Sequence, residues 1–295
     1  MKTFQVITDS TSDVEAKFRE EYDLDYLKMV FTIEGKTYDA DLDWKDLSPK
    51  AYFDSMRKGN RSVTGAIKIT ELEEKFEKYL SQGLDILYIA CSSKLSASVN
   101  TAKSFSEELL EKYKGRRVIC YDSLRSNYAE GYMAITAAKM AKEGKTLDEV
   151  VAYLDENKLK FQTYATVATL DWLKKAGRIK ASTAFFGNLI GVKPIILGDK
   201  NGNNYSFKKV KGRKPSLDEL VNIILERIDN NENNILFIEH ADCESDANYI
   251  RDALKDKFKG QINVSTLGPI ISATTGPDTI TTNFFGEEVT IAGEE

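Results

Sequence analysis

The chain has 295 residues, of which 42% are hydrophobic and 29% are charged, and its net charge is −5. This length predicts two domains or one large one, and the composition excludes a collagen-like, mucin-like or wholly disordered chain. The mean hydropathy is −0.38, and the longest apolar runs, such as residues 86–91, are far shorter than the ~20 residues of a membrane helix. The negative charge argues against general nucleic-acid binding, which favours a basic surface.

Targeting and metal signals are sparse. The N-terminus turns polar too soon for a secretory signal peptide, so we expect a cytoplasmic protein. The cysteines Cys91, Cys120 and Cys243 match neither a zinc-ribbon nor a CxxC spacing. His240 is the single histidine of the chain, which excludes a multi-histidine metal site and leaves one candidate base for a Ser-His-Asp triad. We therefore expect no metal and no cofactor.

The first half alternates strand-like and helical segments. Strands are predicted over residues 4–8, 86–91 and 118–121, because these short runs are apolar and β-branched. Helices are predicted after Ser12 or Asp13 as N-cap, from about Ser96 onward, and over residues 129–141. This β-α-β-α order predicts a parallel sheet covered by helices.

The second half has a different pattern, which predicts a mixed sheet. Strands are predicted over residues 161–167, 192–197, 205–210, 235–239 and 263–267, and helices over residues 170–175, 216–228 and 244–258. The turn residues 198–204 join two of these strands into an antiparallel hairpin, and Gly177 ends the first helix. Residues 268–277, with two Gly-Pro corners, are expected to form a strand. We place an N-terminal domain at 1–160 and a C-terminal domain at 161–295, and leave open whether residues 61–69 cross between them.

Three of the predicted strand ends in the first half carry hydroxyl side chains, at residues 8–12, 92–93 and 122–123. Ligands of open parallel sheets bind beyond the carboxyl ends of the strands, where helix N-termini offer free N–H groups. Each loop alone is as consistent with an ordinary helix cap. Together the three loops favour a site that holds an anion without a metal.

A basic run at residues 208–214 places five cations within seven residues of an acidic chain. It is consistent with a solvated strand edge, on which lysines discourage pairing with other strands. The functional alternative is a docking patch for a transient contact with an anionic membrane surface or for an acidic protein partner.

At this point the chain resembles the DegV family of bacterial fatty-acid-binding proteins. The resemblance spans nearly the whole chain. It is carried by the order and spacing of seven segments: residues 7–12 (ITDSTS), 92–96 (SSKLS), 121–123 (YDS), 170–179 ending in Gly-Arg-Ile, 193–194 (KP), 268–277 (GPIISATTGP) and 283–286 (NFFG). The resemblance implies a two-domain α/β protein that holds one long-chain fatty acid in an apolar tunnel between its domains. It also implies that the chain is a non-catalytic binding subunit, which presents the fatty acid to a separate ATP-using kinase subunit for acyl-phosphate formation.

The resemblance assigns the carboxylate of the fatty acid to four side chains. Ser93 matches the serine of the family's Ser-x-Leu-Ser-Gly motif, in which Ala97 replaces the glycine here, and Thr64 matches the carboxylate-binding threonine. Gly65 stands where the family has a serine. Arg178 matches the arginine of Gly-Arg-Ile, and Thr274 replaces a histidine found in many relatives.

The acyl tunnel is expected along an apolar stretch that follows Arg178. Four apolar residues of this stretch recur at helical spacing: Phe185, Phe186, Leu189 and Ile190. Ile195 and Phe284 are further candidates for the tunnel wall. Plain core packing explains the same residues equally well.

Two alternative functions remain open from the sequence. One is a serine-dependent acyl hydrolase with Ser93 as nucleophile, although no base is adjacent to it in the sequence. The other is the same fold with a different amphiphile as ligand, because Gly65 and Thr274 depart from the family pattern.

Overall fold

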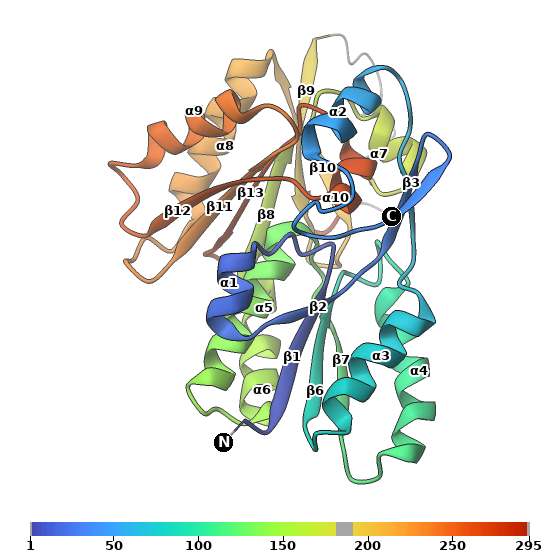
Figure 1. The fold of residues 1–295 in the computed structure, drawn as a ribbon. Helices are drawn as coiled ribbons and strands as arrows, with labels where there is room; N and C mark the ends of the chain where they lie inside the picture. Colours follow the sequence, from blue (N-terminus) through green and yellow to red (C-terminus); the bar gives the residue numbers. More distant parts are fainter. Residues whose placement is uncertain (1, 181–190, 294–295) are drawn as a thin grey trace.

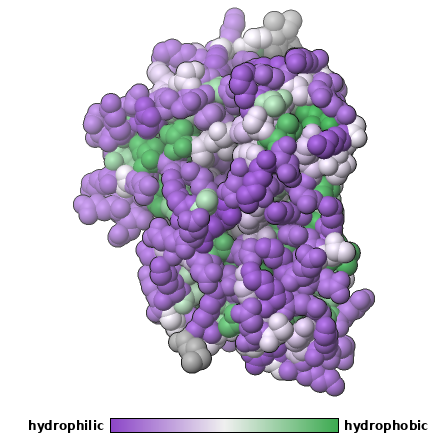
Figure 2. Space-filling model, viewed as in Figure 1, coloured by the Kyte–Doolittle hydropathy of each residue, from purple (hydrophilic) through white to green (hydrophobic). Residues whose placement is uncertain are grey.

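The computed structural model describes residues 2–180 and 191–293. In these ranges the chain forms a parallel sheet, a mixed sheet and a small antiparallel sheet, with helices packed around them (Figure 1). None of the helices in the described ranges is both long and apolar enough to cross a lipid bilayer. Figure 2 shows hydrophilic residues over most of one face of the molecule.

The parallel sheet has the strand order β2-β1-β6-β7. Its strands are β1 (Phe4–Asp9), β2 (Asp25–Leu27), β6 (Asp85–Ala90) and β7 (Val118–Asp122). Its helices are α1 (Ala16–Tyr22), α3 (Ile69–Leu80), α4 (Ser98–Lys112), α5 (Asn127–Lys142) and α6 (Leu147–Asn157), followed by the 3-10 turn η1 (Lys158–Lys160). Alternate side chains of β6 face opposite ways: Ile86 and Tyr88 pack with α3 and α4, whereas Leu87 and Ile89 pack with α1, α5 and α6. The predicted helix-covered parallel sheet is confirmed.

A small antiparallel sheet lies in a region for which the sequence predicted no elements. It has the order β4-β3-β5, with β3 (Val30–Ile33), β4 (Lys36–Asp39), β5 (Val63–Gly65) and the helix α2 (Pro49–Arg57). The Tyr52 hydroxyl of α2 donates a 2.9 Å hydrogen bond to the carbonyl of Pro269, and Arg57 forms ion pairs with Asp242 and Asp278. This part of the first half is therefore anchored on the second half.

The mixed sheet has the order β10-β9-β8-β13-β11-β12, in which β11 and β12 run parallel and the other neighbours run antiparallel. Its strands are β8 (Phe161–Thr166), β9 (Val192–Gly198), β10 (Asn204–Lys211), β11 (Ile235–His240), β12 (Gln261–Thr266) and β13 (Ile280–Phe285). Its helices are α7 (Asp171–Ala176), α8 (Arg213–Arg227), α9 (Glu244–Leu254) and α10 (Pro269–Thr275). The predicted hairpin is confirmed as β9 and β10.

Helix α5 lies between the two large sheets. It contacts β1 of the parallel sheet on one side and β8 and β13 of the mixed sheet on the other. Its residues include Gly131, where an added Cβ would lie 2.4 Å from the Ser12 carbonyl oxygen, so only glycine allows this close approach. The small residues predicted to favour close packing in this helix bring the two halves together.

Two local predictions are wrong. Residues 268–277 were expected to form a strand but contain the helix α10, because Pro269 occupies the first helical position, where its missing N–H costs nothing. Neither Ser12 nor Asp13 caps α1, which begins at Ala16. The Ser12 hydroxyl instead donates to the Asp9 carbonyl at 2.7 Å, and Asp13 turns away with a φ of 54°.

Candidate functional site

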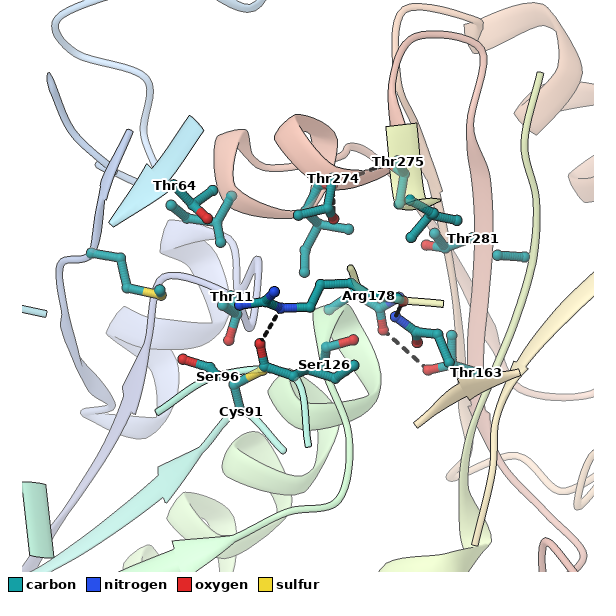
Figure 3. Close-up of a pocket in the computed structure, with 18 of the residues that line it drawn as sticks. Thr11, Thr64, Cys91, Ser96, Ser126, Thr163, Arg178, Thr274, Thr275 and Thr281 are labelled. Carbon is teal, nitrogen blue, oxygen red and sulfur yellow. Dashed lines mark hydrogen bonds between the residues drawn. The ribbon is translucent and has the colours of Figure 1, made fainter. Parts of the chain in front are cut away.

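A cavity of about 210 Å³ lies between the two large sheets, with walls from both halves of the chain and from the small sheet (Figure 3). The parallel-sheet half contributes the loops after β1, β6 and β7, the mixed-sheet half contributes α7, α10 and the strands β8, β9 and β13, and the small sheet contributes β5. The loops follow the carboxyl ends of parallel strands, which is where open α/β sheets place their ligands.

Hydroxyl-bearing residues from seven separate segments line this cavity. They are Thr11 in the loop after β1, Thr64 on β5, Ser96 before α4, Ser126 before α5, Thr163 on β8, the pair Thr274 and Thr275 on α10, and Thr281 on β13. The predicted carboxylate-binding residues Thr64, Arg178 and Thr274 therefore lie around one cavity, although more than 110 residues separate Thr64 from Arg178 in the chain.

The two threonines of α10 use their hydroxyl protons inside the helix. The Thr274 and Thr275 hydroxyls donate to the Ile271 carbonyl at 2.8 Å and 3.1 Å, a common arrangement for threonine in helices. Their oxygens consequently present lone pairs to other groups. Thr274 has to rotate its hydroxyl before it can donate to a ligand carboxylate.

Arg178 links the two halves of the chain at the edge of the cavity. It follows Gly177, whose φ of 67° ends α7 as the sequence predicted. The Arg178 Nε donates to the Leu95 carbonyl at 2.6 Å (Figure 3). Its Nη1 donates to the Ala176 carbonyl at 2.7 Å. The guanidinium group is thereby held beside the hydroxyl cluster, where it provides positive charge.

Ser93 is placed differently from the other predicted site residues. Its backbone amide donates to Asp122 at 3.1 Å, and its side chain is not among those that line the cavity in the described structure. Its neighbours Cys91, Leu95 and Ser96 do line the cavity. Sequence reasoning marked the hydroxyl-rich loop that holds Thr11 but did not select Thr11, Ser96 or Ser126. The position of Ser126 directly before a helix that follows a parallel strand is a signal that could have found it.

The cavity also has an aliphatic wall, formed by Met29, Leu95, Val167, Leu173, Ile196, Ile270 and Ile271. Ile195 and Phe284, which were expected to line an acyl tunnel, pack instead in the core between the mixed sheet and the helices α8 and α9. Ile196 takes the cavity side because successive residues of a strand point to opposite faces. The remaining expected tunnel residues, Phe185, Phe186, Leu189 and Ile190, lie outside the described residues.

A buried acidic network supports the floor of the cavity behind Thr11. The Thr11 hydroxyl bonds to Asp9 and lies 2.7 Å from the Glu130 Oε2, and the Tyr88 hydroxyl donates to Asp9 at 2.6 Å. Complete burial raises the pKa of Glu130, and the charge of Asp9 raises it further. One hydroxyl proton cannot serve two carboxylates, so we expect Glu130 to be neutral and to donate to Thr11.

The described residues contain no group of three or more His, Cys, Asp or Glu side chains arranged to hold a metal ion. Burial raises the pKa of the Cys91 thiol well above its usual range, so this cavity-lining cysteine remains protonated. The polar groups that line the cavity are the hydroxyls, Arg178 and the amides of Asn127 and Asn204.

The fold and the cavity together define an α/β protein with two large sheets and a cavity between its halves. The chain matches the family described as "uncharacterised protein, DegV family" over residues 3–286. A DegV domain-containing protein of Clostridium perfringens is 35% identical over 288 residues, which cover 97% of this chain and 99% of the relative. The chain belongs to the DegV family.

Solved structures show the same fold. A DegV family protein from Thermus thermophilus, described for its fatty acid binding, has a TM-score of 0.86 and 24% identity and covers 97% of this chain and 100% of its own. DegV of Bacillus subtilis, a fatty acid binding protein, has a TM-score of 0.84 at 24% identity, with the same coverage of both chains. This likeness confirms the predicted fold.

Proposed function

We propose that this protein binds one long-chain fatty acid in the cavity between its two large sheets. The supporting observation is the convergence of hydroxyl groups and Arg178 at one end of a cavity that also has an aliphatic wall. DegV family proteins of the same fold from Thermus thermophilus and Bacillus subtilis are described as binding fatty acids. In this proposal Thr64, Ser96 and Arg178 hold the carboxylate, together with Thr274 after rotation of its hydroxyl. Ser93, in the same loop as Ser96, is a further candidate for binding the carboxylate.

The energetics of this arrangement are favourable. A buried carboxylate must be paired or hydrogen-bonded, and charge-assisted hydrogen bonds contribute roughly 1.5–3 kcal/mol each. At ~0.8 kcal/mol for each buried methylene, a chain of about 15 methylenes gains at most ~12 kcal/mol before ordering costs. The cavity of about 210 Å³ is smaller than the ~300–1,000 Å³ typical of small-molecule pockets, so a long chain extends beyond it or widens it.

We further propose that the bound carboxylate is presented to a separate ATP-using kinase subunit, which forms an acyl phosphate. The chain then acts as a binding subunit and performs no catalysis. The hydrolase alternative is less well supported, because His240 is half-buried at the end of β11 and is not among the cavity-lining residues of the described structure.

The basic run at residues 208–214 was the candidate surface for a partner or a membrane. Three of its cations are already paired: Lys208 with Glu219 at 2.7 Å, Arg213 with Asp246 at 2.8 Å and Lys214 with Asp218 at 3.2 Å. This pairing lowers the net positive charge of the run and weakens the case for a transient contact with an anionic membrane. It leaves the kinase contact to be located by experiment.

The ligand is tested by weighing the protein in its native state and again after denaturation. We expect a mass difference equal to one long-chain fatty acid, either in the protein as purified or after incubation with hexadecanoic acid. The absence of any difference under both conditions would contradict the proposal.

The kinase step is tested with hydroxylamine, which traps an acyl phosphate as a hydroxamate. Hydroxamate should form when the loaded protein is mixed with ATP and a bacterial extract, and not with ATP alone.

A further inference from the structure

Two buried carboxyl groups face each other across the boundary between the halves of the molecule. Asp13, in the loop after β1, is 6% exposed, and Glu239, on β11 of the mixed sheet, is completely buried. Neither oxygen of Asp13 nor the Oε1 of Glu239 has a partner at ordinary hydrogen-bond geometry. The Gly268 backbone N–H lies near Asp13 and opposes the rise in its pKa, but burial and Glu239 outweigh it. Two ionised carboxylates in contact would be an uncompensated burial of charge, which is costly. With one proton between them, the same contact becomes a hydrogen bond.

The two oxygens of Glu239 differ sharply in their surroundings. Oε2 accepts hydrogen bonds from the Thr281 hydroxyl at 2.8 Å, the Asn283 amide at 3.0 Å and the Tyr128 backbone N–H at 3.4 Å. Oε1 has no donor and interacts with Asp13. The donors around Oε2 favour negative charge on that oxygen, so the geometry puts the proton on the side that faces Asp13.

The groups around the pair oppose a second negative charge. The charge of Asp9 acts on Asp13, and Glu130 lies nearby in its neutral form. Tyr128, itself bonded to Glu15, lies against Glu239. Lys17 forms an ion pair with Glu15 on the outer side, and His240 lies on the opposite face of β11. Burial, and then the charge of Glu239, raise the pKa of Asp13 well above its usual range. Burial raises the pKa of Glu239 to about 7.

We propose that Asp13 and Glu239 share one proton and that this proton-bound pair positions the walls of the cavity. The inference deepens the proposed function, because it assigns positioning residues and a pH response to the same site. Neither Asp13 nor Glu239 is among the described residues that line the cavity.

Four cavity-lining segments are tied to the pair. Thr281 lines the cavity and donates directly to Glu239, and the Tyr128 amide that bonds Glu239 follows the cavity-lining Asn127. Thr11 lies two residues before Asp13.

The fourth tied segment is α10. Gly268, the residue before this helix, lies so close to Asp13 that an added Cβ would be 1.9 Å from the Asp13 Oδ1. Repulsion between two unpartnered carboxylates would therefore act on α10, on β13 and on the loop after β1 together.

The proton-bound pair predicts a definite pH dependence of folding. Because the pKa values of both carboxyls are raised in the folded protein, the native state holds more protons than the unfolded chain between about pH 4 and the pH at which the pair titrates. The stabilisation is fully present below about pH 4 and is lost as the pH rises through the titration. For each extra proton that the native state holds, the folding equilibrium constant falls up to about tenfold for each unit by which the pH rises in that window.

The test compares the wild-type protein with Glu239→Gln and Asp13→Asn, measured without ligand by urea unfolding between pH 5 and pH 9. Glutamine can keep its oxygen at the Oε2 position and direct its amide toward Asp13, so it reproduces the proton-bound geometry without a titrating proton. Between pH 5 and pH 9, the folding equilibrium constant of the wild type should fall by a factor at least three times larger than that of either variant. Asp252→Asn, which changes an exposed carboxyl on α9, should keep the wild-type profile. A wild-type profile in Glu239→Gln and in Asp13→Asn would overturn the proposal.

If the variants do not fold, carbon-13 NMR of the two carboxyl carbons in the wild-type protein decides. Shared protonation requires both resonances to shift together above pH 6, and separate titrations near pH 4 would overturn the proposal.

The effect of the pair on the cavity is tested by the affinity for hexadecanoic acid at pH 6 and pH 9. From pH 6 to pH 9, the affinity of the wild type should fall by a factor at least three times larger than the affinity of Glu239→Gln. An equal fall in both proteins would refute the positioning role. The ligand-free titration remains decisive for proton sharing even if no fatty acid binds, so failure of the proposed function is recognised separately.

Discussion

The Ser92 hydroxyl donates a 2.8 Å hydrogen bond to the Gly202 carbonyl and so joins the loop after β6 to the turn between β9 and β10. Both residues are buried, and Gly202 has a φ of 89°. A Cβ on Gly202 would lie 2.4 Å from the Ser92 Oγ. This contact connects the parallel-sheet half to the mixed-sheet half, and only a glycine fits there.

The replacement Gly202→Ala should therefore destabilise the protein by about 2–4 kcal/mol, since it combines a left-handed backbone conformation with a steric clash. Gly59→Ala is the matched control, because Gly59 has a φ of 96° but no atom within 4 Å of its added Cβ. The control should cost only about 1–2 kcal/mol. Urea unfolding of both variants measures the difference, and equal losses would show that the Ser92 contact is unimportant.

Loss of a cavity hydroxyl should weaken fatty acid binding without unfolding the protein. Thr64→Val and Ser96→Ala each remove a hydroxyl from the cavity wall, and we expect each to lower the affinity for hexadecanoic acid about tenfold, corresponding to about 1.4 kcal/mol. Ser93→Ala is the informative comparison. The family resemblance predicts a loss at Ser93, whereas the geometry predicts a larger loss at Ser96. Titration calorimetry on the three variants ranks the hydroxyls, and unchanged affinity in all three would refute this head-group site.

The charge of Arg178 should select an acid over an alcohol. We expect the wild-type protein to bind hexadecanoic acid more tightly than hexadecanol, and Arg178→Gln to reduce this preference by about tenfold, because a charge-assisted hydrogen bond is lost. The affinity for hexadecanol should change little, which distinguishes loss of charge from loss of structure. Lys175→Gln, one turn away on α7, is a suitable control for the general removal of a cation. An equal loss for both ligands would indicate that Arg178 acts through its bond to the Leu95 carbonyl.

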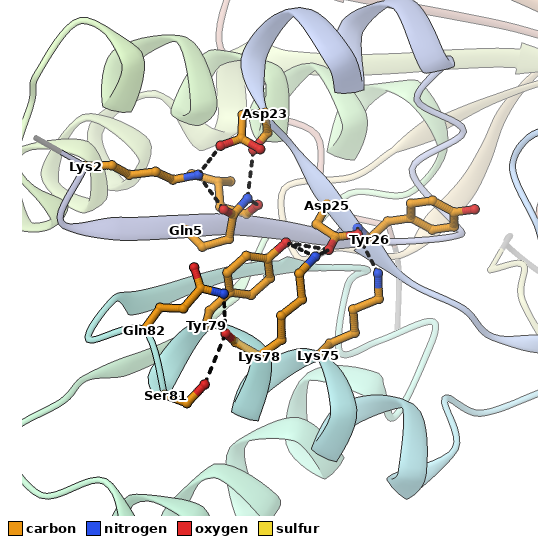
Figure 4. Close-up of polar contacts among 11 residues, drawn as sticks. Lys2, Gln5, Asp23, Asp25, Tyr26, Lys75, Lys78, Tyr79, Ser81 and Gln82 are labelled. Atoms are coloured by element: carbon orange, nitrogen blue, oxygen red, sulfur yellow. Dashed lines mark hydrogen bonds and ion pairs between the residues drawn. The ribbon is translucent and has the colours of Figure 1, made fainter.

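Asp25 should make the parallel sheet sensitive to acid. Burial alone would raise the pKa of Asp25, but hydrogen bonds from Lys75 and Tyr79, each 2.6 Å long, outweigh it and lower the pKa to about 2 (Figure 4). The stabilisation is therefore present above about pH 4 and is lost as the pH falls toward 2. After allowance for solvent screening it amounts to about 1–2 kcal/mol at pH 7.

The replacement Asp25→Asn should remove this contribution and flatten the acid limb of the stability profile. Asp39→Asn breaks the exposed ion pair with Lys68 and should change the stability by less than about 0.5 kcal/mol. Urea unfolding between pH 2 and pH 7 provides the comparison. If both variants follow the wild-type curve, Asp25 does not contribute through its ionisation.

Local sequence patterns were sufficient where neighbouring residues determine the conformation. The helix ended by Gly177 and the hairpin around residues 198–204 are both present, because a left-handed glycine and a turn-rich segment act on the backbone locally. The same reasoning failed at residues 268–277. Their β-branched residues favour a strand, but Pro269 begins a helix that is buried against α7 and the small sheet. Packing outweighed local propensity there.

The amino-acid sequence by itself determined the α/β class, the alternation of strands and helices, and the chemistry available at the strand ends. The tertiary structure decided which side chains meet. Thr64 and Arg178 line the same cavity, and Ser96 rather than Ser93 forms part of its wall. Phe284 packs in the core of the mixed-sheet half. Such contacts depend on the register and twist of whole sheets, which no short sequence window encodes. The pairing of Asp13 with Glu239 depends in the same way on how the parallel and mixed sheets pack around α5.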